Sequence, residues 1–231
     1  MKSFLSIILF FSGLSIAQAQ CNAFFPIGEG VKWSYDYYDK KDKLTLKTVQ
    51  WFKDVSGSGS SMKAMLVQEM IDAKKDKSIG TSESEWICND GTLHFAINNM
   101  AFEGQAAAPS PSMTMDITGD KMDVPSSLSV GESLKDLHYQ IKMTVSGMTV
   151  MNRKFSVTDR KVVSQEKVET PAGTFDCYKV TYTTTSEGGI GSGTTKTTIW
   201  YAKDVGVVKS ENYNEKGGLM GKQVLSKIEK S

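Results

Sequence analysis

One stretch decides the fold: residues 170–219 read TPAGTFDCYKVTYTTTSEGGIGSGTTKTTIWYAKDVGVVKSENYNEKGGL. Three runs rich in β-branched and aromatic residues are separated here by Pro171, Gly173, the glycines of 188–193 and Gly206. Such runs between glycine turns are typical of consecutive antiparallel strands. The stretch holds no catalytic constellation, so it predicts an architecture and leaves the chemistry open.

The strand pattern continues toward the N-terminus. Residues 31–38 alternate, with Trp33, Tyr35 and Tyr37 on one face and polar residues on the other, which is the period of a half-buried strand. The Asn-Asp-Gly at 89–91 is the strongest hairpin signal in the chain. A strand before it and a strand after it are therefore expected to pair.

The middle of the chain is less regular. Residues 98–112 contain alanine, methionine, phenylalanine and two prolines, which predicts a short helical or irregular segment laid across the concave face of a sheet. Residues 113–118 and 121–124 are expected to form a short hairpin across Gly119-Asp120. Two long strands should follow, over 134–145 and 148–168.

About twelve or thirteen strands result, with no helix of ordinary length. This number favours an all-β fold, either a barrel or a strongly curved antiparallel sheet that forms a half-barrel. At 231 residues the chain is long enough for one such domain with a full core. Residues 20–231 are predicted to be that single domain.

The first 19 residues have the pattern of an export signal. Lys2 supplies the positive charge, residues 4–16 are apolar, and Ala17-Gln18-Ala19 fits a cleavage site. Removing Lys2 takes 27 basic side chains to 26, against 26 acidic ones. The mature chain is then neutral, which excludes a nucleic-acid partner. We expect an exported protein of the periplasm, cell surface or extracellular space.

Three cysteines allow three pairings in an oxidising compartment, and the positions favour Cys21 with Cys88 over a bond to Cys177, which lies in mid-strand. Cys21 also invites a lipid-anchor interpretation, but Gln20 before it is not a small residue. The cysteines lie too far apart in sequence for a CxxC redox or zinc motif.

The usual catalytic patterns are missing from the sequence. It has no Gly-x-Ser-x-Gly, no His-x-His or His-Glu-x-x-His, and only His94 and His138. The glycines of 188–193 match neither a dinucleotide fingerprint nor a phosphate loop. We therefore predict a protein that is not an enzyme and needs no cofactor.

Methionine is concentrated in one region. Thioether sulfurs there suit Cu(I) in an exported protein, but methionine also fills irregular apolar space and adapts to greasy ligands. We favour the apolar interpretation and keep copper as a minor alternative. The methionines are Met100, Met113, Met115, Met122, Met143, Met148 and Met151.

The motifs PAGTF at 171–175, Trp200 and GVV at 206–208 carry a resemblance. With Cys21 and the opening FPIGEG at 25–30, they make the chain resemble the TapB-like exported domains of bacterial envelope proteins, a group similar to the domain of unknown function 3108. The resemblance implies a curved antiparallel sheet like that of lipoprotein carriers. It brings no catalytic residue.

The sequence thus favours a half-barrel that holds a lipid or another hydrophobic ligand on its concave face. The alternative is an interaction module that binds an envelope protein through a strand edge or a hairpin tip. Each candidate liner has packed core as its competing interpretation. The candidates are Trp33, Tyr35, Tyr37, Trp86, Met100, Phe102, Met143, Phe155, Phe175 and Trp200.

Overall fold

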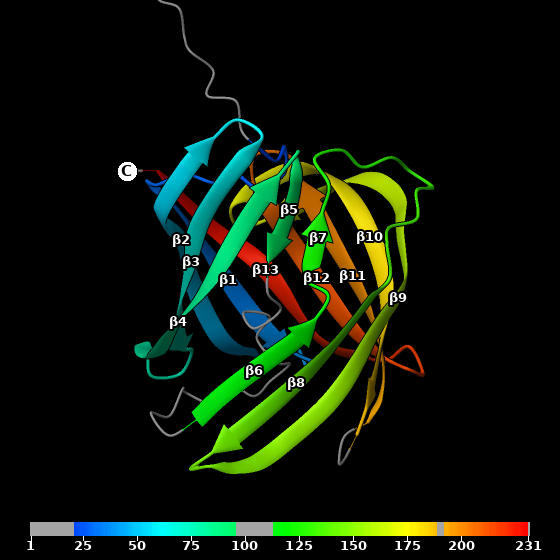
Figure 1. Cartoon of the computed structure of the whole chain (residues 1–231). Helices are drawn as coiled ribbons and strands as arrows, with labels where there is room; N and C mark the ends of the chain where they lie inside the picture. The colour runs from blue at the N-terminus through cyan, green and yellow to red at the C-terminus, as the bar shows by residue number, and fades with distance from the viewer. Residues whose placement is uncertain (1–20, 96–112, 189–191, 231) are drawn as a thin grey trace, which may run out of the picture.

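The structure is a computed structural model that describes residues 21–95, 113–188 and 192–230. These residues form one antiparallel sheet of 13 strands, in the order β6-β8-β9-β10-β11-β12-β13-β1-β2-β3-β4-β5-β7. Figure 1 shows the sheet bent around an interior, as the predicted half-barrel requires. The signal segment and residues 98–112 lie outside the described residues.

The bounds of the strands are β1 Val31–Asp39, β2 Leu44–Ser58, β3 Ser61–Asp72, β4 Lys77–Asn89, β5 Thr92–Phe95, β6 Met113–Gly119, β7 Met122–Val124, β8 Leu137–Val145, β9 Met148–Thr170, β10 Gly173–Glu187, β11 Gly193–Ala202, β12 Gly206–Asn214 and β13 Leu219–Lys230.

The sheet is not closed by a ladder of hydrogen bonds, because β6 and β7 are its two edges. These strands follow each other in the chain, but β6 pairs with β8 and β7 pairs with β5. The predicted hairpin between them is therefore wrong. Asp120 and Lys121 form a corner at which the chain passes from one edge of the sheet to the other, so each strand faces a different neighbour.

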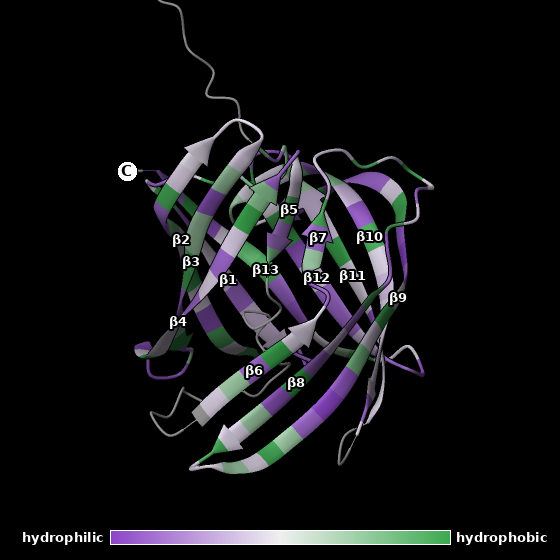
Figure 2. Ribbon diagram, in the orientation of Figure 1, coloured by the Kyte–Doolittle hydropathy of each residue, from purple (hydrophilic) through white to green (hydrophobic). Residues whose placement is uncertain are grey.

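Side chains alternate between the two faces, as the sequence pattern requires. In β1, Trp33 and Tyr35 are buried while Lys32 is exposed. Figure 2 shows hydrophobic and hydrophilic residues alternating along strands such as β8 and β9. In these strands the inner face is therefore the more apolar of the two.

The predicted hairpin at 89–91 is present and joins β4 to β5. Asp90 and Gly91 both have positive φ, 48° and 80°. Two successive positive φ values are the mark of the tight turn that matches the twist of paired strands. The sequence signal therefore has its ordinary physical cause.

Candidate functional site

The first described residues close one end of the interior, at the top of Figure 1. Cys21 and Cys88 form a disulfide, which is the pairing that the sequence favoured. A sulfur in a disulfide cannot also carry a thioether-linked lipid. Asn22 is fully buried, donates to the carbonyls of Gly91 (2.9 Å) and Val124 (2.8 Å), and accepts from the Phe24 amide (2.9 Å).

Two aromatic rings follow and fill this end. Phe24 is fully buried and meets Tyr178 edge-on, with ring centroids 5.7 Å apart. Phe25 meets Trp86 at 5.2 Å and leaves no room at Gly206, where a Cβ atom would lie 2.8 Å from the Phe25 ring. Neither phenylalanine can be recognised as a core residue from the sequence pattern, because both precede the first strand and follow no strand period.

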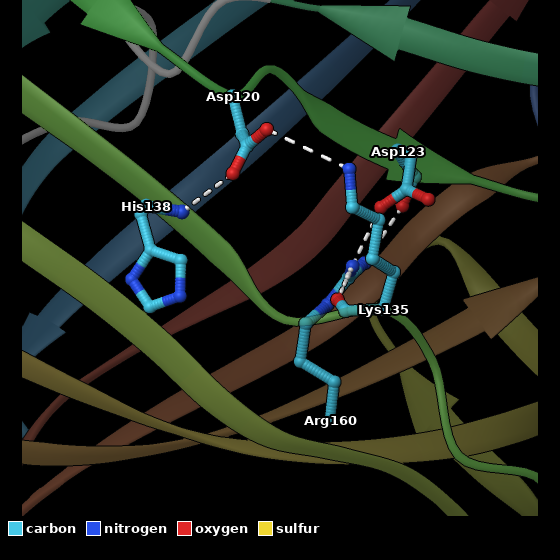
Figure 3. A network of polar contacts seen from close by, with 5 residues as sticks. All are labelled: Asp120, Asp123, Lys135, His138 and Arg160. Carbon is cyan, nitrogen blue, oxygen red and sulfur yellow. Dashed lines mark hydrogen bonds and ion pairs between the residues drawn. The ribbon is translucent and has the colours of Figure 1, made fainter.

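Side chains bridge the open seam between β7 and β9 (Figure 3). Arg160 of β9 has a buried side chain, and its Nη1 donates to Asp123 Oδ1 and to the Lys135 carbonyl, both at 2.5 Å. Its Nη2 donates to the Asp123 carbonyl at 2.8 Å. One guanidinium thus joins β7, the loop after it and β9, where no ladder does.

A second set of contacts holds the corner itself. The Asp120 backbone amide donates to the His138 carbonyl at 2.8 Å. In return, the His138 backbone amide donates to Asp120 Oδ2, also at 2.8 Å. The bond from the His138 amide is the largest cause that lowers the pKa of Asp120. Lys135 Nζ lies 3.6 Å from Asp120 Oδ1. The corner is therefore fixed to β8 as the seam is fixed to β9.

Behind the seam lies a cavity of about 10 Å³, lined by Arg160, Asp123, Tyr182, Tyr201 and apolar neighbours. This is room for about one water molecule. Buried aromatic and aliphatic side chains pack together around it. A lipid chain does not fit in this space.

Below the aromatic core the inner face becomes polar. Thr48 and Gln68 are almost fully buried, and Gln50 Nε2 donates to Gln68 Oε1 at 2.6 Å. Thr48 lies directly opposite Tyr35, and Gln50 directly opposite Trp33. On the far side of β1, Ser210 of β12 contacts Gln223 of β13, and Thr197 donates to Asn212 at 2.9 Å. We call Thr48, Gln50, Gln68, Ser210 and Gln223 the polar layer.

Two buried donor atoms have no hydrogen-bond partner of ordinary geometry among the described residues: Thr48 Oγ1 in this layer and Trp33 Nε1 beside it. The Thr48 hydroxyl lies near the Tyr37 phenol, but not in good hydrogen-bond geometry. Burial raises the pKa of Tyr37 to about 12, with Thr48 acting in the opposite direction. Burial likewise raises the pKa of Tyr35, whose hydroxyl donates to the Val207 carbonyl at 3.1 Å. These phenols therefore remain neutral donors.

The opposite end of the molecule is built by β6, β8 and the start of β9, which we call the arm; it reaches the bottom of Figure 1. Met143 pairs with Met115 on one side and Met151 on the other, and Ile141 pairs with Ile117. All five alternate in phase with the buried Leu137, so they share the inner face. Met115, Ile117, Met143 and Met151 are only half-buried.

The structure brings most of the predicted liners together. Trp33, Tyr35, Trp86 and Phe155 belong to one buried cluster, and Tyr37 packs against it. Phe175 packs against both this cluster and a second one, and it pairs with Val168 of the second cluster. In the first cluster the predicted liners fill space, as Trp33 and Trp86 do against Phe52. Met143 is on the arm. Met100 and Phe102 lie outside the described residues.

Trp200 is placed elsewhere. It packs with Val168, Cys177 and Val208 in a second cluster, while Ile199 and Tyr201 on either side of it belong to the inner cluster. Its indole therefore faces outward, between the ammonium groups of Lys179 and Lys209 at 5.2 and 4.8 Å from the ring centroid. Trp200 does not line the concave face.

The described residues hold no group of three histidine, cysteine or acidic side chains that suits a metal ion. The ring of His138 is exposed and lies 3.1 Å from Ser156 Oγ, its directly opposed neighbour on β9. The Asp120 carboxylate binds the His138 backbone rather than that ring. The arrangement is that of a strand face. Nor do the described residues include a helix that would cross a membrane.

A model of the DUF3108-like family matches residues 28–225. A crystal structure from Bacteroides fragilis, described as a candidate exported protein with a YmcC-like fold, has 28% identity and a TM-score of 0.76. A candidate lipoprotein from Parabacteroides distasonis has 21% identity and a TM-score of 0.75, and each match covers 91% of this chain and 100% of the other. No functionally curated protein matches the chain.

Proposed function

Because this chain belongs to the DUF3108-like family and carries an export signal pattern, we propose that it is an exported binding protein without enzymatic activity, whose ligand is apolar. The 28% identical neighbour, described as a candidate exported protein, supports the location. The ligand lies on the inner face of the arm. The cavity behind the seam, of about 10 Å³, is too small for a hydrocarbon chain.

The observation that carries this proposal is the row of half-buried apolar side chains on the arm. Met115, Met143 and Met151 lie side by side on three neighbouring strands, with Ile117 one step away. Unbranched thioether side chains adapt to ligands of varied shape. Fully burying an exposed side chain of this size contributes about 1.5–3 kcal/mol, so covering one that is already half-buried contributes roughly half of that.

The test is titration with the apolar fluorescent reporter N-phenyl-1-naphthylamine. We expect saturable binding at one site per chain, displaced by single-chain amphiphiles. Met143→Gln should weaken binding about tenfold, which corresponds to 1.4 kcal/mol. Met220→Gln is the matched control, because Met220 is 40% exposed and lies away from the arm on β13. Absence of saturable binding, or equal effects of the two variants, would refute the proposal.

The methionine row also bears on the copper alternative. Three thioether sulfurs on one face are soft ligands of the kind that bind Cu(I). However, Arg153 is the register neighbour of Ile141 on the same face, and a cationic side chain disfavours a second cation nearby. The apolar interpretation is therefore preferred, and Cu(I) competition with a chromogenic chelator separates the two.

A second candidate function is protein binding through β6. This strand ends the sheet over seven residues, and the neighbouring β8–β9 tip exposes Met148 by 70% and Val150 by 58%. An edge strand of this kind can accept a strand from a partner. A photo-crosslinking residue at Thr114 in the exporting cell should then capture one dominant protein, whereas a ligand carrier should give none.

A further inference from the structure

The unpartnered Trp33 indole beside the polar layer is the starting point. Its side chain is 5% exposed, and Nε1 finds no acceptor among the described residues. An indole N–H can only donate, and leaving it buried without an acceptor costs about 1–3 kcal/mol. A group that carries an acceptor atom would satisfy this donor.

The surroundings show which acceptor would fit this place. Along β1, β2 and β3 the inner face shows Trp33, Gln50 and Gln68 in one register row, with Thr48 in the next row toward the arm end. Trp33 Nε1 and the Thr48 hydroxyl lack a partner of good geometry, while the Tyr35 phenol is already used by the Val207 carbonyl. The layer thus offers unused donors.

Charge decides between the possible acceptors. The five residues of the polar layer are all uncharged, and the nearest row positions are Trp33, Tyr35 and Tyr37. Arg160 has a buried side chain that is already committed to Asp123 and two carbonyls, and Arg153 lies on the arm beside Ile141 rather than in the layer. A carboxylate placed in the layer would lose hydration without gaining a counter-ion. A neutral carbonyl or ether oxygen suffers no such loss.

We infer that the polar layer binds the neutral ester or amide carbonyl of an amphiphile, with Trp33 Nε1 as a donor and the hydrocarbon chain directed toward the arm. This rests on the proposed function and names the ligand class. The order of the rows supports the direction: from Trp33 the inner face of β1 runs through Tyr35 and Tyr37 to the turn at Asp39, at the same end as the arm.

The experiment compares three probes of equal chain length below their micelle concentrations: 1-dodecanoylglycerol, dodecanoate and dodecylamine. The ester should bind at least tenfold more tightly than either charged probe. In ¹H–¹⁵N spectra of the four tryptophan indoles, only the Trp33 signal should move downfield when the ester binds.

Variants sharpen the test. Trp33→Phe keeps an aromatic ring and removes the donor, so affinity for the ester should fall roughly two- to tenfold. Trp51→Phe is the control, because Trp51 alternates out of phase with Gln50 and its ring faces the Lys32 ammonium at 5.4 Å. Thr48→Val is a second, nearly isosteric variant in case Trp33→Phe does not fold.

The outcomes are distinct. Equal affinity for all three probes with an unmoved Trp33 signal overturns this inference and leaves the proposed function standing. Failure of every probe and of the naphthylamine reporter overturns both. A Trp33 indole that exchanges with water and ignores the ester assigns the layer to buried water, and the inference then fails.

Discussion

The seam gives the sharpest test of how this sheet is held together. Arg160→Met removes the guanidinium but keeps a long apolar side chain. The carboxylate of Asp123, whose side chain is 22% exposed, then loses its cation, and two carbonyls lose a donor. Removing one partner of a buried pair costs about 3–5 kcal/mol.

Partial exposure of Asp123 favours the lower end of that range, because water reaches the abandoned carboxylate. We therefore expect a loss of about 3 kcal/mol in the free energy of unfolding. For a domain of this size each kcal/mol lowers the melting temperature by about 2–4 °C, so Tm should fall by roughly 6–12 °C. Lys167→Met is the matched control, because Lys167 and Asp176 are a pair 74% and 72% exposed, and such pairs contribute about 0–1 kcal/mol.

Hydrogen exchange locates the effect. The amides of Gly131 and Leu134 donate to the carbonyls of Val162 and Arg160, across the seam. These amides should lose protection in Arg160→Met by more than the amides of β2 and β3, which lie far from it in the sheet. If Arg160→Met costs no more than Lys167→Met, or if protection falls equally everywhere, the seam is not held by this side chain.

Three further predictions concern the cysteines and one carboxylate. Burial raises the pKa of the Cys177 thiol to about 11, and the other two cysteines form a disulfide. Iodoacetamide at neutral pH should therefore label no cysteine in the native protein and one cysteine per chain in denaturant. Labelling of the native protein would contradict this prediction. The Cys21–Cys88 disulfide closes a loop with a sequence separation of 67, and the lost chain entropy of the unfolded state stabilises the fold by about 4 kcal/mol. The variant with both cysteines replaced by serine should therefore unfold at a clearly lower denaturant concentration, and an unchanged unfolding midpoint would contradict this prediction. The Trp200 indole donates to Glu166 at 2.7 Å, and this hydrogen bond lowers the pKa of the Glu166 carboxyl. The ionised carboxylate therefore stabilises the fold at neutral pH, and this contribution is lost as pH falls through the folded-state pKa. Glu166→Gln should flatten the loss of stability below about pH 4, and stability curves that run parallel in the two proteins would refute this.

Sequence periodicity was sufficient for the strands. The alternation around Trp33 and the Asn-Asp-Gly turn act over a few residues, so each can be interpreted without knowing what lies across the sheet. The predicted hairpin at Gly119-Asp120 failed because a turn signal does not say which strand the next one will join. Trp200 was misplaced for a similar reason: a tryptophan in a strand can face either side, and its neighbours Lys179 and Lys209 come from other strands.

Local chemistry, then, was enough to determine an exported all-β chain with a disulfide and no recognisable catalytic motif. Only the tertiary structure decided where the interior is full and where it is polar. Phe24, Phe25 and Arg160 contact residues 25 to 181 positions away, and the polar layer is assembled from four strands, two near the start of the chain and two near its end. Long-range pairing of this kind depends on sheet order, which no short stretch of the sequence contains.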